Sequence, residues 1–251
     1  MPRSSHLVRI VILAASAALT LSCGGPDEGD AISFVEREVV RSADGCEPGA
    51  PDCAWVKLRW LDADGGDPAV HDIVDGWIVT RILDPLGDDW VVEGPEDVAT
   101  ALLEDRAEFV EDFPDAASAG WYLERELRRL PAPEGLVSLE FTERQYTGGA
   151  HGVESVRLVT FRTSDGAVLG LDDLVPANDR AAFRDRVEAA FRAARGLGPD
   201  EDLAEAGFFI EGDRLPPTDN VARILEGVRL RYDAYEIAPY AMGPTDLIVP
   251  M

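Results

Sequence analysis

Lysine is almost missing from this chain. Lys57 is the single lysine, and lysine and arginine together number 23 against 48 aspartates and glutamates, for a formal net charge of −25. A surface of this charge repels nucleic acid and attracts cationic partners. We therefore expect no nucleic-acid partner. Two explanations of the acidity stay open: a solvated surface that maintains solubility, and a surface that captures a basic protein or a cation.

The sequence also lacks the short motifs that identify common enzymes. It contains no Gly-x-Ser-x-Gly, His-Glu-x-x-His or Ser-x-x-Lys, and no glycine-rich phosphate loop before a helix. The segment 62–67 faintly resembles a calcium loop, but its glycines and acids do not follow EF-hand spacing. We interpret it as an acidic turn, and we predict neither a metal site nor a cofactor.

A hydrophobic run long enough to cross a bilayer is missing too. The longest run, Ile10–Leu21, falls short of the roughly 20 residues that a membrane-spanning helix needs. Arg3 and Arg9 precede it, and this arrangement is typical of a secretion signal over residues 1–22. We predict export to the cell envelope.

The residues around Cys23 resemble a bacterial lipobox, in which the cysteine receives a lipid and anchors the protein to a membrane. Thr20 stands where an aliphatic residue is usual, so plain cleavage to a soluble secreted protein remains the alternative. Residues 23–31 read as a flexible tether. Cys46 and Cys53 flank a turn-rich segment. Two cysteines without nearby histidines are too few ligands for zinc, so we predict a disulfide in an oxidising compartment.

The pattern of residues 32–130 predicts an N-terminal α+β lobe. Strands are expected at 32–40 and 54–61, and helices at 70–86, 95–113 and about 115–130. Pro131–Gly135 breaks the chain, and we place a domain boundary there.

Residues 136–251 predict a second domain. Strands are expected at 137–141, 153–163, 167–171, 208–210, 228–232 and 246–249, and a helix capped by Asn178 is expected to run to about Ala194. Strands and helices do not alternate regularly. The fold class that follows is α+β, with mixed or antiparallel sheets packed by helices.

Two stretches of the second domain hold the candidate site residues. Residues 146–152, Tyr-Thr-Gly-Gly-Ala-His-Gly, place Tyr146 and His151 at a tight strand connection. His151 with Glu154 or Asp165 would make an acid–base pair, whereas the structural alternative is that these rings hold the turn together. Residues 235–244 contain Tyr235, Glu236 and Tyr240 as further ligand-binding candidates. Glu236 there would otherwise satisfy backbone donors.

These stretches, together with Leu171–Leu174, Asp219-Asn220 and the ending Val249-Pro250, resemble a C-terminal domain of unknown function. That domain is shared by the ectodomain of the RsiV anti-sigma factor and by the peptidoglycan deacetylase PdaC. The resemblance covers 136–251, and 45–130 resembles the smaller domain that precedes it. An anti-sigma segment and a deacetylase domain are not expected in this chain.

The resemblance implies an exported, non-catalytic lipoprotein with an RsiV-like binding module. Its partner would be a cell-wall glycan or a cationic protein such as lysozyme. Two alternatives remain: an envelope hydrolase that uses His151 and a carboxylate, and a structural or assembly lipoprotein.

Overall fold

The structure is a computed structural model that describes residues 32–116, 120–210 and 214–251. The predicted signal, the lipidation of Cys23 and the tether lie outside the described residues. None of the helices in the described ranges is long and apolar enough to cross a bilayer.

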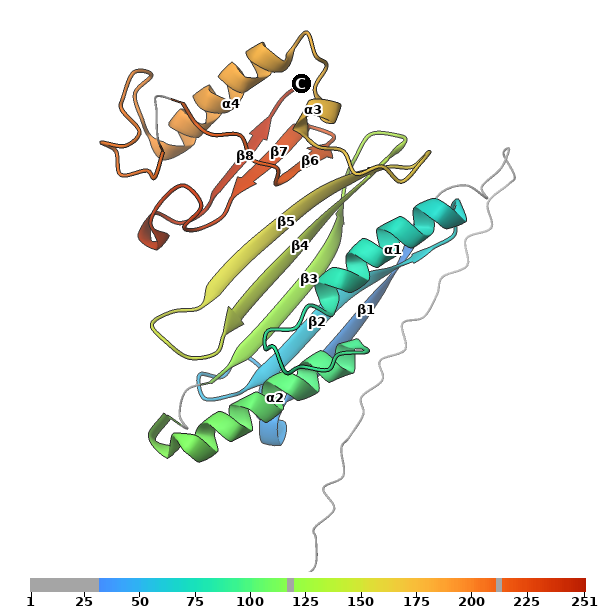
Figure 1. Cartoon of the computed structure of the whole chain (residues 1–251), viewed down its shortest axis with the longest axis vertical. Helices are drawn as coiled ribbons and strands as arrows, with labels where there is room; N and C mark the ends of the chain where they lie inside the picture. The colour runs from blue at the N-terminus through green and yellow to red at the C-terminus, as the bar shows by residue number, and fades with distance from the viewer. Residues whose placement is uncertain (1–31, 117–119, 211–213) are drawn as a thin grey trace, which may run out of the picture.

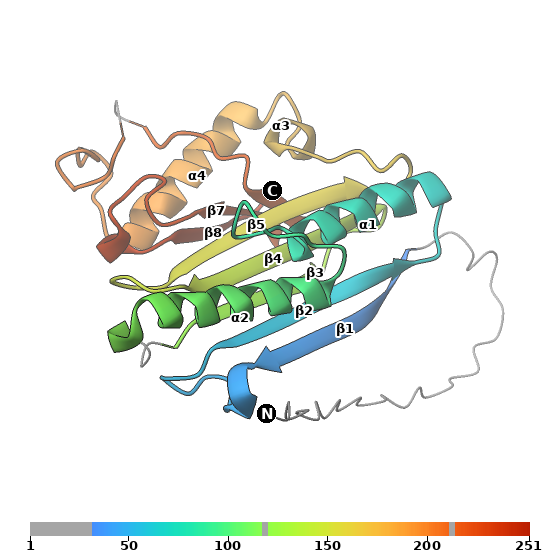
Figure 2. The same cartoon turned by 60° about the horizontal axis from the view of Figure 1, so that its bottom comes forward.

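A five-stranded sheet forms the larger part of the molecule (Figure 1). Its strands follow chain order: β1 (Ser33–Ser42), β2 (Trp55–Asp64), β3 (Tyr122–Leu130), β4 (Leu136–Tyr146) and β5 (Val153–Arg162). Neighbours are antiparallel except β2 and β3, which run parallel. A parallel pair needs a long crossover. Here the crossover contains α1 (Pro68–Ile82) and α2 (Pro95–Asp112), and both helices cover one face of the sheet (Figure 2).

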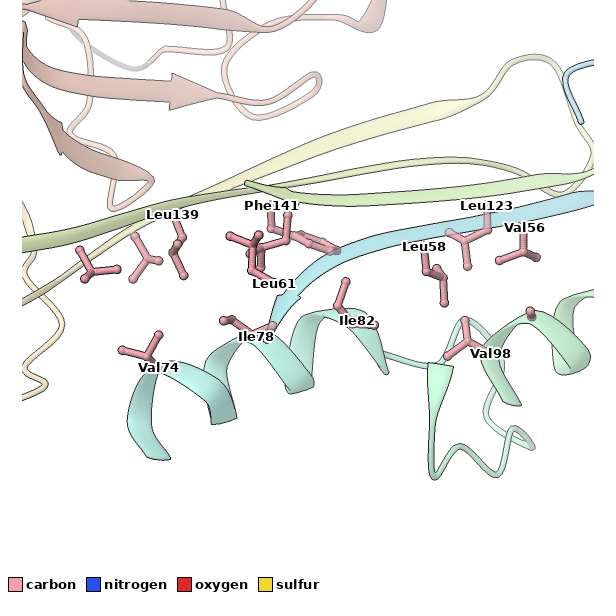
Figure 3. Close-up of a cluster of buried hydrophobic side chains, with 14 of the residues drawn as sticks. Val56, Leu58, Leu61, Val74, Ile78, Ile82, Val98, Leu123, Leu139 and Phe141 are labelled. Atoms are coloured by element: carbon pink, nitrogen blue, oxygen red, sulfur yellow. The ribbon is translucent and has the colours of Figure 1, made fainter. Parts of the chain in front are cut away.

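The larger core lies between these helices and the sheet. In α1 every fourth residue is buried, from Val70 to Ile82, because a step of four keeps side chains on one face of a helix. Figure 3 shows Ile78 and Ile82 directed at the sheet, where Leu58 and Phe141 belong to the same cluster. Burial of each such aliphatic side chain stabilises the fold by about 1.5–3 kcal/mol.

The rest of the molecule is built around a second, three-stranded antiparallel sheet. It consists of β6 (Val221–Ile224), β7 (Gly227–Tyr232) and β8 (Thr245–Val249). The short α3 (Leu171–Leu174) and the longer α4 (Arg180–Arg195) precede it, and α4 packs against β8. α4 contributes Phe183, Val187 and Phe191 to a separate hydrophobic core.

The small sheet is joined to the edge strand β5 by side chains that imitate a neighbouring strand. The amide of Asn220 accepts a hydrogen bond from Leu158 N and donates one to Val156 O, both at 2.7 Å. Asp233 accepts from Val156 N at 3.3 Å. These side chains form hydrogen bonds with backbone N–H and C=O groups on the outer edge of β5. The five-stranded sheet therefore ends at β5.

The predicted fold class is confirmed, with sheets of both kinds packed by helices. The predicted disulfide is present: Cys46 and Cys53 are bonded, with their Cα atoms 5.6 Å apart. Pro131–Gly135 joins β3 to β4, which pair side by side. The predicted boundary therefore falls inside one continuous sheet.

Several predicted elements were wrong. The helix expected at about 115–130 is the strand β3, in which Leu123, Arg125 and Leu127 alternate as buried residues. The spacing of its leucines suits a helix equally well, and pairing with β2 and β4 decides for a strand. Residues 208–210 form no strand, and residues 167–171 pair with β5 only through a bridge at Val168. α1 ends at Ile82, and the residue that precedes α4 is Asp179 rather than Asn178.

Candidate functional site

The connection from β4 to β5 is a tight loop whose glycines adopt left-handed backbone angles. Gly148 and Gly149 have φ of 102° and 98°, which side-chain-bearing residues rarely adopt. The Tyr146 hydroxyl donates to Gly149 O at 3.0 Å and fastens the loop. This contact agrees with the structural alternative for Tyr146.

The segment 233–244 forms a second loop with its own internal bonds. Glu236 accepts a hydrogen bond from Asp233 N at 2.8 Å, so its carboxylate satisfies a backbone donor. Tyr235 N donates to Ala238 O at 3.1 Å, and Tyr235 has a φ of 68° without being a glycine. Such a backbone angle is uncommon in a bulky residue.

The two loops meet at one end of the molecule (Figures 1 and 2). The imidazole of His151 stacks on the ring of Tyr240, with centroids 3.7 Å apart and planes 12° apart. The Tyr240 hydroxyl donates to Gly152 O at 2.9 Å. The Tyr235 hydroxyl lies 3.5 Å from His151 Nε2, and its ring centroid lies 5.6 Å from that of Tyr240. We call His151, Tyr235 and Tyr240 the aromatic triad.

The aromatic triad is open to solvent. Tyr235 is 58% exposed and Tyr240 is 37% exposed, and His151 also belongs to the exposed residues. Residues that are more than 80 positions apart in the chain thus present three rings at one surface. The sequence predicted these residues separately, and the structure brings them together.

Tyr146 belongs to a different group of rings. It stacks on Tyr122 at 6.2 Å, and Tyr122 stacks on Trp55 at 5.5 Å. This aromatic row, Trp55–Tyr122–Tyr146, crosses β2, β3 and β4 at the end nearest the triad. Gly152 lies beside it, because a Cβ there would stand 2.6 Å from the Tyr122 hydroxyl oxygen. The sequence did not mark Trp55 or Tyr122 as candidates, since only the register of the strands aligns them.

A hollow of about 310 Å³ adjoins Tyr240. Glu154 lines one side, and Ala234 with residues 240–244 lines the rest. Glu154 accepts hydrogen bonds from Arg144 at 2.8 Å and from Arg231 at 3.0 Å. Burial by itself raises the pKa of this carboxyl, but the two arginines outweigh it and lower the pKa. The hollow therefore contains an ionised carboxylate in a fixed position.

The acid–base pair considered for His151 is not assembled. His151 Nδ1 lies 2.9 Å from Gly152 O, and Nε2 faces Tyr235. Glu154 is held by arginines, and Asp165 lies beyond the far end of β5, where it accepts from Arg162 at 2.8 Å. Neither carboxylate is hydrogen-bonded to His151. His151 is therefore held by a backbone carbonyl and a tyrosine, and the pairing with a carboxylate that the sequence suggested is not formed.

The described residues contain no cluster of side chains that could bind a metal ion. Over the described ranges, no group of three or more histidine, cysteine, aspartate or glutamate side chains could hold an ion. The arrangement at the aromatic triad presents ring faces and hydroxyls to solvent, with the Glu154 carboxylate in the adjoining hollow.

Two solved structures share this fold. A member of the DUF3298 family from Bacteroides fragilis matches with a TM-score of 0.66 and 21% identity, over 88% of this chain and 91% of that one. A DUF3298 family protein from Pseudomonas aeruginosa matches with a TM-score of 0.58 and 24% identity, over 88% of this chain and 92% of that one. No curated protein matches the sequence.

A family model locates the likeness within the sequence. Residues 172–251 match the family described as "Protein of unknown function (DUF3298)". The match includes Tyr235 and Tyr240 and begins after His151. The aromatic triad therefore joins a residue outside the matched range to two inside it, and the similarity to this family is located in residues 172–251.

Proposed function

We propose that this protein is a non-catalytic binding module of the cell envelope and that the aromatic triad contacts its ligand. The observation that carries the proposal is the stacking of His151 on Tyr240 with Tyr235 alongside, all open to solvent. Tyrosine rings held in fixed positions contribute large contact area at little cost in conformational entropy, which is why they recur at binding hot spots.

The charge of the protein favours a cationic protein, such as one of the lysozyme type, as the partner. The formal net charge is −25, with 48 aspartates and glutamates against 23 lysines and arginines. Lysine and arginine side chains of a partner are attracted both to carboxylates and to the faces of tyrosine rings. The resemblance to the RsiV ectodomain supports the same class of partner, and a cell-wall glycan is the competing ligand.

The proposed location is the cell envelope, with the protein held to a membrane by a lipid on Cys23. The basic start, the short apolar run and the lipobox-like residues support it. Mass spectrometry of the mature protein tests this part. A diacylglyceryl adduct on Cys23 is expected in the wild type and absent in Cys23→Ser, whereas an unmodified N-terminus in the wild type would contradict it.

Calorimetry at two salt concentrations tests the binding function. The protein from residue 24 onward is titrated with lysozyme and, separately, with soluble peptidoglycan fragments. We expect saturable one-to-one binding of lysozyme that persists at high salt, where long-range attraction between exposed charges is screened. Heat that vanishes with salt would reduce the interaction to that of an acidic protein with a basic one.

Substitutions in the triad locate the contact. Tyr235→Ala removes a ring that is 58% exposed and is expected to weaken binding about tenfold or more, as loss of a hot-spot residue does. Tyr146→Phe serves as the control because it removes only the bond to Gly149 O outside the triad. Equal affinity of Tyr235→Ala and wild type would show that the triad does not contact the ligand. Binding of glycan but not of lysozyme would change the class of partner.

A further inference from the structure

A second pocket, of about 220 Å³, lies away from the aromatic triad between α4 and the segment 214–218. Its walls are mainly apolar and include Leu171, Val187, Leu215 and Leu230. Leu230 is a buried residue of β7, and Val187 is a buried residue of α4. The pocket is thus a gap in the packing between the helix and the small sheet that opens to the surface.

Hydrogen bonds hold the walls of this pocket in place. Glu188 on α4 accepts from Leu215 N at 2.7 Å, and the Tyr232 hydroxyl donates to Pro216 O at 2.7 Å. Both bonds fasten the segment 214–218 to the elements beneath it. The pocket therefore exists before any ligand arrives, which lowers the entropic cost of binding.

Among the described residues, the ion pairs around the pocket do not include Arg184. Asp185 pairs with Arg214, and Glu188 pairs with Arg192 at 2.8 Å. Arg184 lines the pocket and has no ion pair or hydrogen bond to any of the described residues. In so acidic a protein an anion is generally repelled, but here two nearby carboxylates are paired with other arginines, and none of the described carboxylates pairs with Arg184.

We propose that this pocket binds a short free fatty acid, with the alkyl chain against Val187 and Leu230 and the carboxylate on Arg184. A dry apolar cavity of about 150 Å³ accommodates benzene, so the volume here suits a chain of about six to eight carbons. A guanidinium matches a carboxylate in charge and in planar geometry. The alkyl chain supplies burial of apolar surface, and Arg184 selects for the acid over the alcohol.

Titration of the full chain with octanoate and with octanol, followed by NMR of the amides of α4 and β7, tests this site. We expect saturable shifts around Val187 and Leu230 with octanoate, and weaker binding of octanol. Arg184→Gln is expected to weaken octanoate about fivefold and to leave octanol unchanged, since one partly solvated ion pair is lost. Arg129→Gln, an equal change of charge on the exposed face of β3, is the control.

A filling substitution provides an independent check. Val187→Phe places a larger apolar side chain in the pocket and is expected to abolish binding of both ligands, with a thermal unfolding curve to show that the variant folds. No shifts in the wild type, or equal octanoate affinity in Arg184→Gln and wild type, would overturn the proposal. Tighter binding of N-acetylleucine than of octanoate would contradict the fatty acid as ligand and would indicate a peptide carboxyl terminus instead.

Discussion

Arg125 and Glu143 form an ion pair inside the core of the larger sheet. The Arg125 side chain is 0% exposed, and its Nε donates to Glu143 Oε2 at 2.7 Å across the register of β3 and β4. Its Nη1 also donates to Ile82 O at 2.8 Å. Ile82 ends α1, where free carbonyls and the helix dipole favour a cation. One buried side chain therefore ties two strands to the end of a helix.

Removal of Glu143 tests the cost of leaving this guanidinium unpaired. Glu143→Ala is expected to lower the free energy of unfolding by about 3–5 kcal/mol, because a buried charge loses its counter-ion. Urea denaturation measures the change. Glu134→Ala, in the exposed turn between β3 and β4, is the control and is expected to change stability by less than about 0.5 kcal/mol. Similar effects of the two substitutions would contradict the role of the pair.

Asn220→Asp tests the junction between the two sheets. The substitution keeps the shape of the side chain but turns the group that donates to Val156 O into an acceptor. We expect a loss of about 1–3 kcal/mol, since a satisfied pair becomes a repulsive one. Hydrogen exchange gives the specific signal: repulsion between the new carboxylate and Val156 O should displace the side chain from β5, so the Leu158 amide that Asn220 accepts from should lose protection. Asp219→Asn, at the exposed neighbouring position, should leave that amide unchanged, and unaltered protection in Asn220→Asp would refute the junction.

The pKa of Glu154 predicts how stability depends on pH. Burial raises this pKa, but Arg144 and Arg231 lower it by more. The pKa of Glu154 is therefore lower in the folded state than in the unfolded chain. A carboxyl of this kind stabilises the fold above its unfolded pKa, and the contribution is lost as the pH falls through the folded pKa. Relative to Glu154→Gln, the wild type should have its full advantage at pH 7 and lose it below about pH 4.3. A difference in Tm that stays constant down to pH 3 would contradict this.

The Cys46–Cys53 disulfide closes a short loop just before β2. Restricting a loop of about eight residues in the unfolded chain corresponds to about 2–3 kcal/mol. Thermal unfolding with and without reductant should show this loss in the wild type. The double variant Cys46→Ser, Cys53→Ser should match the reduced wild type and should not respond to reductant. A response of that variant would place the effect of the reductant elsewhere.

Local sequence patterns predicted those elements whose pattern fits only one kind of secondary structure. The four-residue spacing from Val70 to Ile82 predicted α1, because a helix buries one face whatever lies beneath it. The glycines of the loop 146–152 predicted a tight connection, and Gly148 and Gly149 adopt the backbone angles that glycine permits. By contrast, the spacing of Leu123 and Leu127 satisfied two patterns at once. The parallel pairing of β3 with β2 was needed to decide between them.

The sequence by itself determined the acidic composition, the disulfide and the α+β class, and it named His151, Tyr235 and Tyr240 as candidates. These follow from composition and from contacts between residues close in the chain. Only the tertiary structure decided that His151 stacks on Tyr240. It also decided that Glu154 is hydrogen-bonded to Arg144 and Arg231 and not to His151. The physical reason is distance along the chain. Such contacts depend on how β5 and the small sheet pack through Asn220, and no local preference encodes that packing.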